Sequence, residues 1–173
     1  EDKNLVRHLR SDSTWEMRAA WHQIVDRNLR SVAPELISIV ENPRMPLEHR
    51  IHALWTVEDL RALNVETVLN LTRESNRNLR REAIRTLASI KPDSVQTMAI
   101  LADNVRDPDP QVRAEVIQVA RANIHYAPIL QILARMVQPS LAAPIAKSPH
   151  NGQPMKLREA YDRDFERYLI RAT

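Results

Sequence analysis

Two histidines, His49 and His52, come closest to forming half of a metal site in this sequence. They are three positions apart, which places both imidazoles on one face of a helix. A zinc site needs three or four protein ligands, and no convergent third ligand is evident in the sequence. His49 also falls in an apolar column of the repeat described below. We therefore interpret both as packing or capping residues and expect no metal site.

A second group with catalytic potential is the acidic run in "REAYDRDFER", residues 158–167. Paired carboxylates can act as acid and base. These acids alternate with arginines, however, which is typical of ion pairs on an exposed helix face. Cysteine is absent, and the single glycine, Gly152, cannot build a phosphate-binding loop. We predict no catalytic residue and no cofactor site, so that this chain by itself is not an enzyme.

The sharpest candidate for a partner-binding patch is formed by His52, Trp55 and Asp59. Their spacing of three and four residues places them on one helix face. The equivalent positions of the other repeats are mostly polar, so this face is expected to point outward. An aromatic residue there suggests contact with something outside the repeat. The alternative is that Trp55 packs under the neighbouring repeat or a long loop, since large aromatic side chains are usually mostly buried.

The elements that position these residues are marked by four arginines. Arg18, Arg50, Arg80 and Arg113 follow one another at spacings of 32, 30 and 33 residues. Mostly apolar residues recur one position before, three positions after and seven positions after each of these anchor arginines. These positions are spaced as i, i+4 and i+8 and form one stripe of a helix. His22 shares a column with Leu54, Ile84 and Ile117, and is predicted to pack in the core. A period of this size indicates a solenoid of stacked helical pairs.

The regular placement of these arginines favours a structural role. They could form a strip that binds anions. The interpretation we prefer is that they pair with acidic residues of the helices or of the joints, the short segments that link the two helices of each pair. Examples of such acids are Asp12, Glu74 and Asp107. The same Asp12 and Asp107 could accept hydrogen bonds from free N–H groups at the next helix start. Pro46 and Pro110 suit a first helical turn.

Each anchored helix has an apolar helix before it: "LVRHLR", "PELISIV", "ETVLNLT" and "VQTMAILADNV". Residues 1–137 are therefore predicted to hold about four helical pairs and the first helix of a fifth. Residues 138–154, which contain four prolines and the glycine, are predicted to form an irregular loop. Residues 155–173 are predicted to form a C-terminal capping helix. The predicted fold class is all-α, an α-solenoid of helical hairpins.

The charge balance disfavours a nucleic-acid partner. The net charge of +3 arises from 25 basic and 22 acidic residues, and the acids are interleaved with the arginines. A nucleic-acid module usually clusters its basic residues on one face. No apolar run reaches the roughly 20 residues of a membrane span. The chain lacks an initiator methionine, which suggests that it is a piece of a larger protein. Its start therefore does not indicate where the protein is located.

Two resemblances narrow the function. The Asp/Pro joints, the anchoring arginines and the helix stripe over residues 4–137 resemble HEAT-like repeats of the armadillo-type fold. More narrowly, "LVRHLRSDSTWEMRAAWHQIVDR" and "MPLEHRIHALWTVEDLRAL" resemble the helical segment of multidomain membrane-bound dehydrogenase-like haem-binding proteins of planctomycetes and verrucomicrobia. The string "HALWT", residues 52–56, is the most specific match, whereas Glu16 stands where that family commonly has a second aromatic residue.

The narrower resemblance implies a non-catalytic connector. In that family a β-propeller of the sugar-dehydrogenase type precedes the repeats and a cytochrome c-like haem domain follows them. The chain would then be a scaffold in a periplasmic or secreted electron-transfer protein, and its partners would be the flanking domains or another protein. The alternative is a nucleic-acid-binding module of the HEAT-like DNA glycosylase type. A lyase-type or chromophore-handling HEAT protein ranks last, because nothing marks a chromophore pocket.

Overall fold

A computed structural model describes residues 2–90, 94–142, 145–146 and 155–172. They are mostly helical and form two compact units, residues 1–92 (unit 1) and 93–173 (unit 2), which are described separately. The helices of unit 1 are α1 (Asp2–His8), α2 (Thr14–Asp26), the 3-10 turn η1 (Arg30–Val32), α3 (Ala33–Glu41), α4 (Leu47–Asp59), α5 (Val65–Leu71) and α6 (Arg77–Ile90). Unit 2 contains α7 (Ser94–Asn104), α8 (Pro110–Ala122), α9 (Ile129–Met136), the strands β1 (Ile145–Ala146) and β2 (Met155–Lys156), and α10 (Glu159–Arg171).

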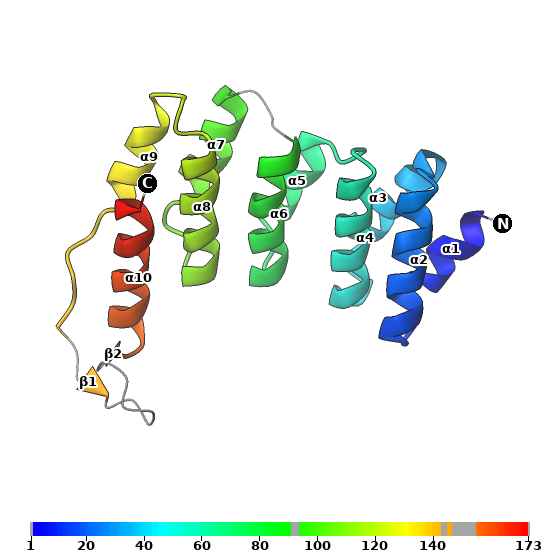
Figure 1. Cartoon of the computed structure of the whole chain (residues 1–173), viewed down its shortest axis with the longest axis horizontal. Coiled ribbons are helices and arrows are strands. Elements are labelled where there is room, and N and C mark those ends of the chain that lie inside the picture. The colour runs from blue at the N-terminus through cyan, green and yellow to red at the C-terminus, as the bar shows by residue number, and fades with distance from the viewer. Residues whose placement is uncertain (1, 91–93, 143–144, 147–154, 173) are drawn as a thin grey trace. The chain divides into compact units, whose positions relative to one another are not determined.

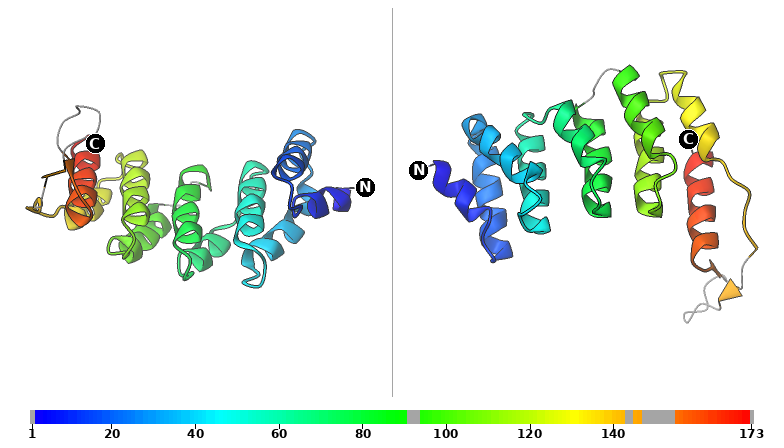
Figure 2. Two further views of the ribbon diagram at one scale, coloured as in Figure 1. Left: turned by 90° about the horizontal axis from the view of Figure 1, so that it is seen from below. Right: turned by 180° about the vertical axis from the view of Figure 1, so that it is seen from behind.

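Unit 1 consists of three helical hairpins stacked in chain order. The second helices α2, α4 and α6 lie side by side in one layer, and the first helices α3 and α5 are neighbours in the other (Figure 1, Figure 2). Fully buried side chains from both layers, such as Leu36, Leu54 and Leu71, form the core between them. One hairpin cannot bury its apolar stripe alone, so successive hairpins stack.

Unit 2 repeats this arrangement with an insertion. Helix α7 packs on α8, α9 lies beside α7, and α10 lies beside α8. Helix α10 therefore takes the place of a second helix next to α8, as α4 does next to α2. The short antiparallel pairing of β1 with β2 lies between α9 and α10 in the chain. Most of the predicted irregular loop, at residues 143–144 and 147–154, lies outside the described residues.

The fold class predicted from the sequence, an all-α solenoid of helical hairpins, is confirmed. The residue before each anchor arginine is buried in all four repeats, and these residues are Met17, His49, Leu79 and Val112. Within the described residues, no helix is both long and apolar enough to cross a bilayer.

One predicted core position was wrong. His22 is exposed, although Leu54, Ile84 and Ile117 in the same column are fully buried. The His22 imidazole instead stacks on the neighbouring Trp21 indole, with ring centroids 5.5 Å apart. This arrangement covers one apolar face while leaving the imidazole accessible to water.

The predicted helix caps also require correction. The N-cap of α2 is Ser13, whose hydroxyl accepts from the Glu16 N–H, and Asp12 is exposed one residue earlier. The N-cap of α8 is Asp109, whose carboxylate accepts from the N–H groups of Gln111 and Val112. Asp107 lies two residues before this cap and accepts from the Asp109 N–H at 2.8 Å. In each joint the capping residue is the one with extended backbone just before the first helical residue.

Candidate functional site

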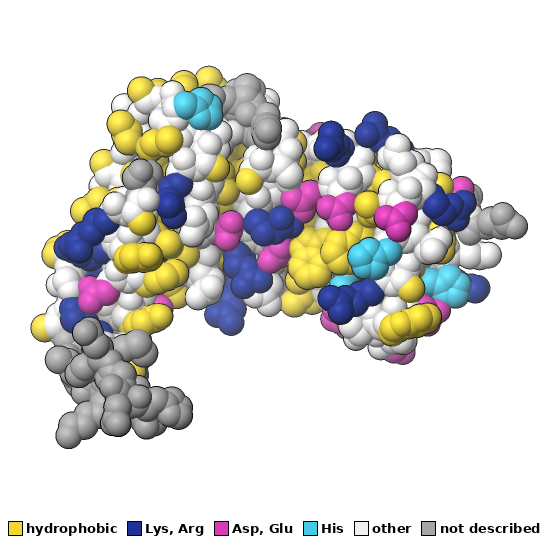
Figure 3. All heavy atoms as spheres, in the orientation of Figure 1, with side chains coloured by type: hydrophobic (Ala, Val, Ile, Leu, Met, Phe, Trp, Pro, Cys, Tyr) yellow, Lys and Arg dark blue, Asp and Glu magenta, His cyan; other side chains and the backbone are white. Residues whose placement is uncertain are grey.

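Four aromatic rings gather on the second helices of unit 1. Helix α2 contributes Trp21 and His22, and α4 contributes His52 and Trp55; we call these four residues the aromatic cluster. The Trp21 and Trp55 ring centroids are 5.9 Å apart, and the His52 ring meets Trp55 edge-on at 5.2 Å. Trp21 and Trp55 are both half-buried. Figure 3 shows apolar side chains and a histidine together on this face over α2 and α4.

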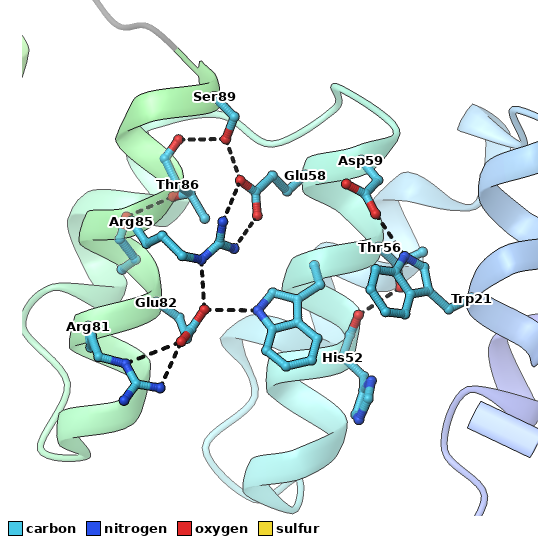
Figure 4. A network of polar contacts seen from close by, with 12 residues as sticks. Trp21, His52, Thr56, Glu58, Asp59, Arg81, Glu82, Arg85, Thr86 and Ser89 are labelled. Carbon is cyan, nitrogen blue, oxygen red and sulfur yellow. Dashed lines mark hydrogen bonds and ion pairs between the residues drawn. The ribbon is translucent and has the colours of Figure 1, made fainter. Parts of the chain in front are cut away.

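Both indoles are fixed by hydrogen bonds to carboxylates. The Trp21 Nε1 donates to Asp59 of α4, and the Trp55 Nε1 donates to Glu82 of α6, each at 2.9 Å (Figure 4). An indole has a single polar atom, so one such bond satisfies it and sets the ring orientation. The cluster therefore presents partly exposed aromatic faces that are already held in position.

Buried charge supports the ring of Trp55. Glu82 accepts from Arg81 and Arg85 as well as from Trp55, and Arg85 also pairs with Glu58 across the seam between α4 and α6. Burial raises the pKa of Glu82, but the hydrogen bonds from Arg85, Trp55 and Arg81 outweigh it, so that the pKa of Glu82 is lowered from its ordinary value. Glu82 is thus ionised at neutral pH and remains an acceptor for the Trp55 indole.

His52 is held in its neutral form. Burial is the main reason that the pKa of His52 is lowered, and the charges of His49 and Arg18 add to it. The buried Nδ1 atoms of His49 and His52 have no hydrogen-bond partner among the described residues. In the part of the chain that the structure describes, no three His, Asp or Glu side chains lie close enough together to hold a metal ion. His52 acts here as an aromatic packing residue.

The structure brings together the three residues of the predicted patch, but not on an open face. His52 and Trp55 are half-buried and in contact, while Asp59 is exposed and binds Trp21 of the preceding repeat. Ala20 and Glu82, which occupy the column of His52, are buried. The expectation that this column points outward was therefore wrong: it lies at the seam between neighbouring second helices.

Sequence reasoning missed several members of the site. Trp21 lies three positions after Arg18, at an apolar-stripe position that predicts a core residue, and the sequence did not single out Glu58, Glu82 and Arg85. A signal was present, because a half-buried indole needs an acceptor for its N–H. Glu82 lies one repeat after His52 in the same column and was the nearest carboxylate on the next second helix.

Three of the four anchor arginines donate to backbone carbonyls at or beside the joints, which supports a structural role. Buried Arg50 donates to the Val40 carbonyl at 2.7 Å and pairs with Glu74. Arg80 donates to the backbone carbonyls of the same joint, at residues 74 and 75. Arg113 donates to the Asp107 carbonyl at 2.7 Å and pairs with Glu166 of α10. Arg18 is exposed.

This protein is built of stacked helical pairs whose joints are held by arginines. These features define it as a helical-repeat protein, and its second helices carry a partly exposed aromatic cluster. Comparison with known families is consistent with this class. The profile of HEAT repeats matches residues 33–121, just over half of the chain, and the chain belongs to this family. HEAT repeats generally serve as scaffolds for protein interaction. No curated protein and no solved structure showed significant similarity to the chain.

Proposed function

We propose that this chain is a non-catalytic interaction scaffold whose partner-binding surface is the aromatic cluster together with Asp59. The observation that carries the proposal is the pair of half-buried indoles, 5.9 Å apart, with each N–H already satisfied by a carboxylate of the next second helix. Tryptophan in a preorganised, partly desolvated setting is typical of residues that dominate binding energy. A partner would meet the cluster without first ordering it.

The proposed partner is a domain attached to the same scaffold. The string "HALWT" that carries the resemblance to dehydrogenase-like haem-binding proteins contains both His52 and Trp55, which are half of the aromatic cluster. The resemblance and the site thus rest on the same residues. On this proposal the chain connects a propeller-type dehydrogenase domain with a haem domain, and the cluster is where one of them docks.

The arginines near the cluster support a protein partner over nucleic acid. Arg81 and Arg85 pair with Glu82, and Arg85 pairs also with Glu58. A phosphate backbone binds cations that are free to replace its counterions. We expect no shift of duplex or single-stranded DNA by the chain at low salt, and a salt-sensitive shift would favour the glycosylase-like alternative.

The direct test uses the reading frame from which this chain derives. The two domains encoded beside the repeats are expressed separately, and their binding to the chain is measured by calorimetry. We expect Trp55→Ala to weaken binding at least about ten-fold, which corresponds to about 1.4 kcal/mol. Trp15→Ala, which removes an exposed indole of α2 outside the cluster, is the matched control and should leave binding unchanged.

Stability separates the two roles of Trp55. If Trp55 serves mainly for packing, Trp55→Ala should cost more than about 3 kcal/mol of unfolding free energy without a specific loss of binding. That result would contradict the proposal. A reading frame that encodes neither a propeller nor a haem domain beside the repeats would contradict the connector role. Flanking domains that bind wild type and Trp55→Ala with equal affinity would contradict the assignment of the binding surface.

A further inference from the structure

One edge of the aromatic cluster carries the charge of Asp59. Asp59, the last residue of α4, is exposed, and its Oδ2 atom accepts a hydrogen bond from the Trp21 indole at 2.9 Å (Figure 4). An indole is neutral, so this bond orients the carboxylate and leaves its charge in place. Glu58, one residue earlier, is by contrast paired with Arg85. In the part of the chain that the structure describes, Asp59 forms no ion pair.

The ends of two neighbouring helices add to this negative charge. Helix α4 ends at Asp59 and α2 ends at Asp26, and neither helix has a basic residue in its last turn. Arg27, directly after α2, is paired with Asp2. The C-terminal end of a helix carries a partial negative charge, which basic residues usually offset. Figure 3 shows acidic side chains along the upper border of the apolar patch over α2 and α4, whereas basic side chains lie to its left and below it. This edge of the cluster therefore favours a cation.

The carboxylate of Asp59 is accessible in spite of its bond to Trp21. Asp59 also lines a hollow of about 700 Å³, whose other lining residues are Glu58, Arg61, Leu63, Ser89 and Ile90. Arg61, the cation of this hollow, is exposed and is not paired with Asp59. A side chain of a partner can therefore reach the carboxylate from solvent without displacing a group that is bonded to it.

We propose that the partner of the aromatic cluster inserts an arginine side chain, which pairs with Asp59 and stacks on the Trp21 ring. A guanidinium is planar and weakly hydrated, so it can cover an indole and bond a carboxylate at the same time, as an ammonium group cannot. The Trp21 N–H occupies Oδ2 of Asp59, and Oδ1 remains for the guanidinium. This inference rests on the proposed function, since it names the chemistry by which a partner would meet the same surface.

The test uses the intact 173-residue chain and three defined peptides. They are acetyl-Gly-Leu-Arg-Leu-Gly-amide and its analogues with citrulline or lysine in the central position; citrulline has the shape of arginine without its charge. Binding is followed by NMR through the indole N–H signals of the three tryptophans. We expect the arginine peptide to shift the Trp21 signal saturably. The citrulline peptide should bind at least about five-fold more weakly, as expected for one exposed cation–π contact and one exposed ion pair. The lysine peptide should also bind more weakly than the arginine peptide.

Asp59→Asn removes the charge but keeps an oxygen acceptor for the Trp21 N–H. It should lower the affinity for the arginine peptide to that for the citrulline peptide and leave the latter unchanged. Asp12→Asn, at an exposed carboxylate of the α1–α2 joint, is the matched control and should bind all three peptides as wild type does.

Three results would overturn the inference: no binding of the arginine peptide, equal affinity for the arginine and citrulline peptides, or Asp59→Asn binding the arginine peptide as wild type does. A lysine peptide that binds as tightly as the arginine peptide would overturn the assignment to arginine. The connector role is tested separately, by calorimetry with the flanking domains. Flanking domains that do not bind the chain would contradict that role whatever the peptides show.

Discussion

The two units share one repeat but fill the seams between their second helices differently. In unit 1 the seams contain indoles and carboxylates, with Trp21 bonded to Asp59 and Trp55 bonded to Glu82. In unit 2 the seam between α8 and α10 is closed by the anchor itself, as Arg113 pairs with Glu166. Arg121 adds a hydrogen bond to the backbone carbonyl of residue 172. No aromatic pair spans the α8–α10 seam among the described residues.

This difference shows which columns the fold constrains. Leu54, Ile84 and Ile117 occupy one core column of three repeats and are all fully buried, so this column is apolar in both units, with exposed His22 of α2 as the exception. The seams differ in burial, and charge pairs, aromatic rings or both can close them: the α4–α6 seam of unit 1 contains the Arg85–Glu58 pair as well as Trp55. The repeat can therefore change its surface chemistry without changing its core, and unit 1 has used that freedom to build the aromatic cluster.

The largest effects are expected in the shared core column. Leu54→Ala in unit 1 and Ile117→Ala in unit 2 should each cost about 2–5 kcal/mol, because each leaves a cavity in a fully buried site. His22→Ala, in the same column but exposed, should change stability by less than about 0.5 kcal/mol. Urea unfolding is followed by tryptophan fluorescence, which reports unit 1 since all three tryptophans lie there, and by circular dichroism. A loss of unfolding free energy for His22→Ala comparable with that for Leu54→Ala would show that His22 packs in the core after all.

The anchor arginines should give the next largest effects, and these should differ between the units. Arg113→Met strands the Glu166 carboxylate, whose side chain is 7% exposed, and should cost about 2–4 kcal/mol. Arg50→Met strands Glu74, which at 25% exposure remains in contact with water, and should cost about 1–3 kcal/mol.

Two further variants test the cause of these losses. Adding Glu166→Gln to Arg113→Met should recover part of the loss, because it removes the stranded charge. Arg18→Met, at an exposed anchor, should be nearly neutral. Equal losses at all four anchors would show that their role does not depend on the partners seen in each unit.

The sequence contains enough information for the repeat, but not for the seams. The period of the arginines and the apolar stripe predicted the helical pairs, since burial of a helix stripe depends only on spacing along one helix. Whether Trp21 faces the core or the seam depends on the rotation of α2 against α4, which spacing does not determine. The antiparallel pairing of β1 with β2 links segments separated by an irregular sequence that carries no periodic signal.

The helix caps illustrate the same limit on a smaller scale, and they should produce effects of about 1 kcal/mol. Asp109→Ala removes the acceptor for two N–H groups of α8, and Ser13→Ala removes the acceptor for one N–H of α2. We expect the larger loss for Asp109→Ala. Asp12→Ala should be neutral, because Asp12 precedes the cap and is exposed. Thermal unfolding of the three variants checks the order, and a loss for Asp12→Ala matching that of Ser13→Ala would return the cap to Asp12.

The smallest predicted effect is a pH dependence of the unfolding free energy that arises from His52 in the α2–α4 seam of unit 1. Since burial lowers the pKa of His52, the unfolded chain binds more protons than the folded chain just below pH 6.5. Unfolding free energy must therefore rise with pH in that range. The contribution of His52 is complete above the unfolded value of 6.5 and is lost as the pH falls through the lower, folded value.

We expect the unfolding free energy of unit 1, followed by tryptophan fluorescence, to fall by less than about 1 kcal/mol between pH 7.5 and 5.5 because of His52. The effect is small since His52 is only half-buried. His52→Gln should remove that part of the slope, while His125→Gln, at an exposed site of unit 2, should leave it intact. If wild type and His52→Gln show identical slopes, His52 is not held neutral by the seam.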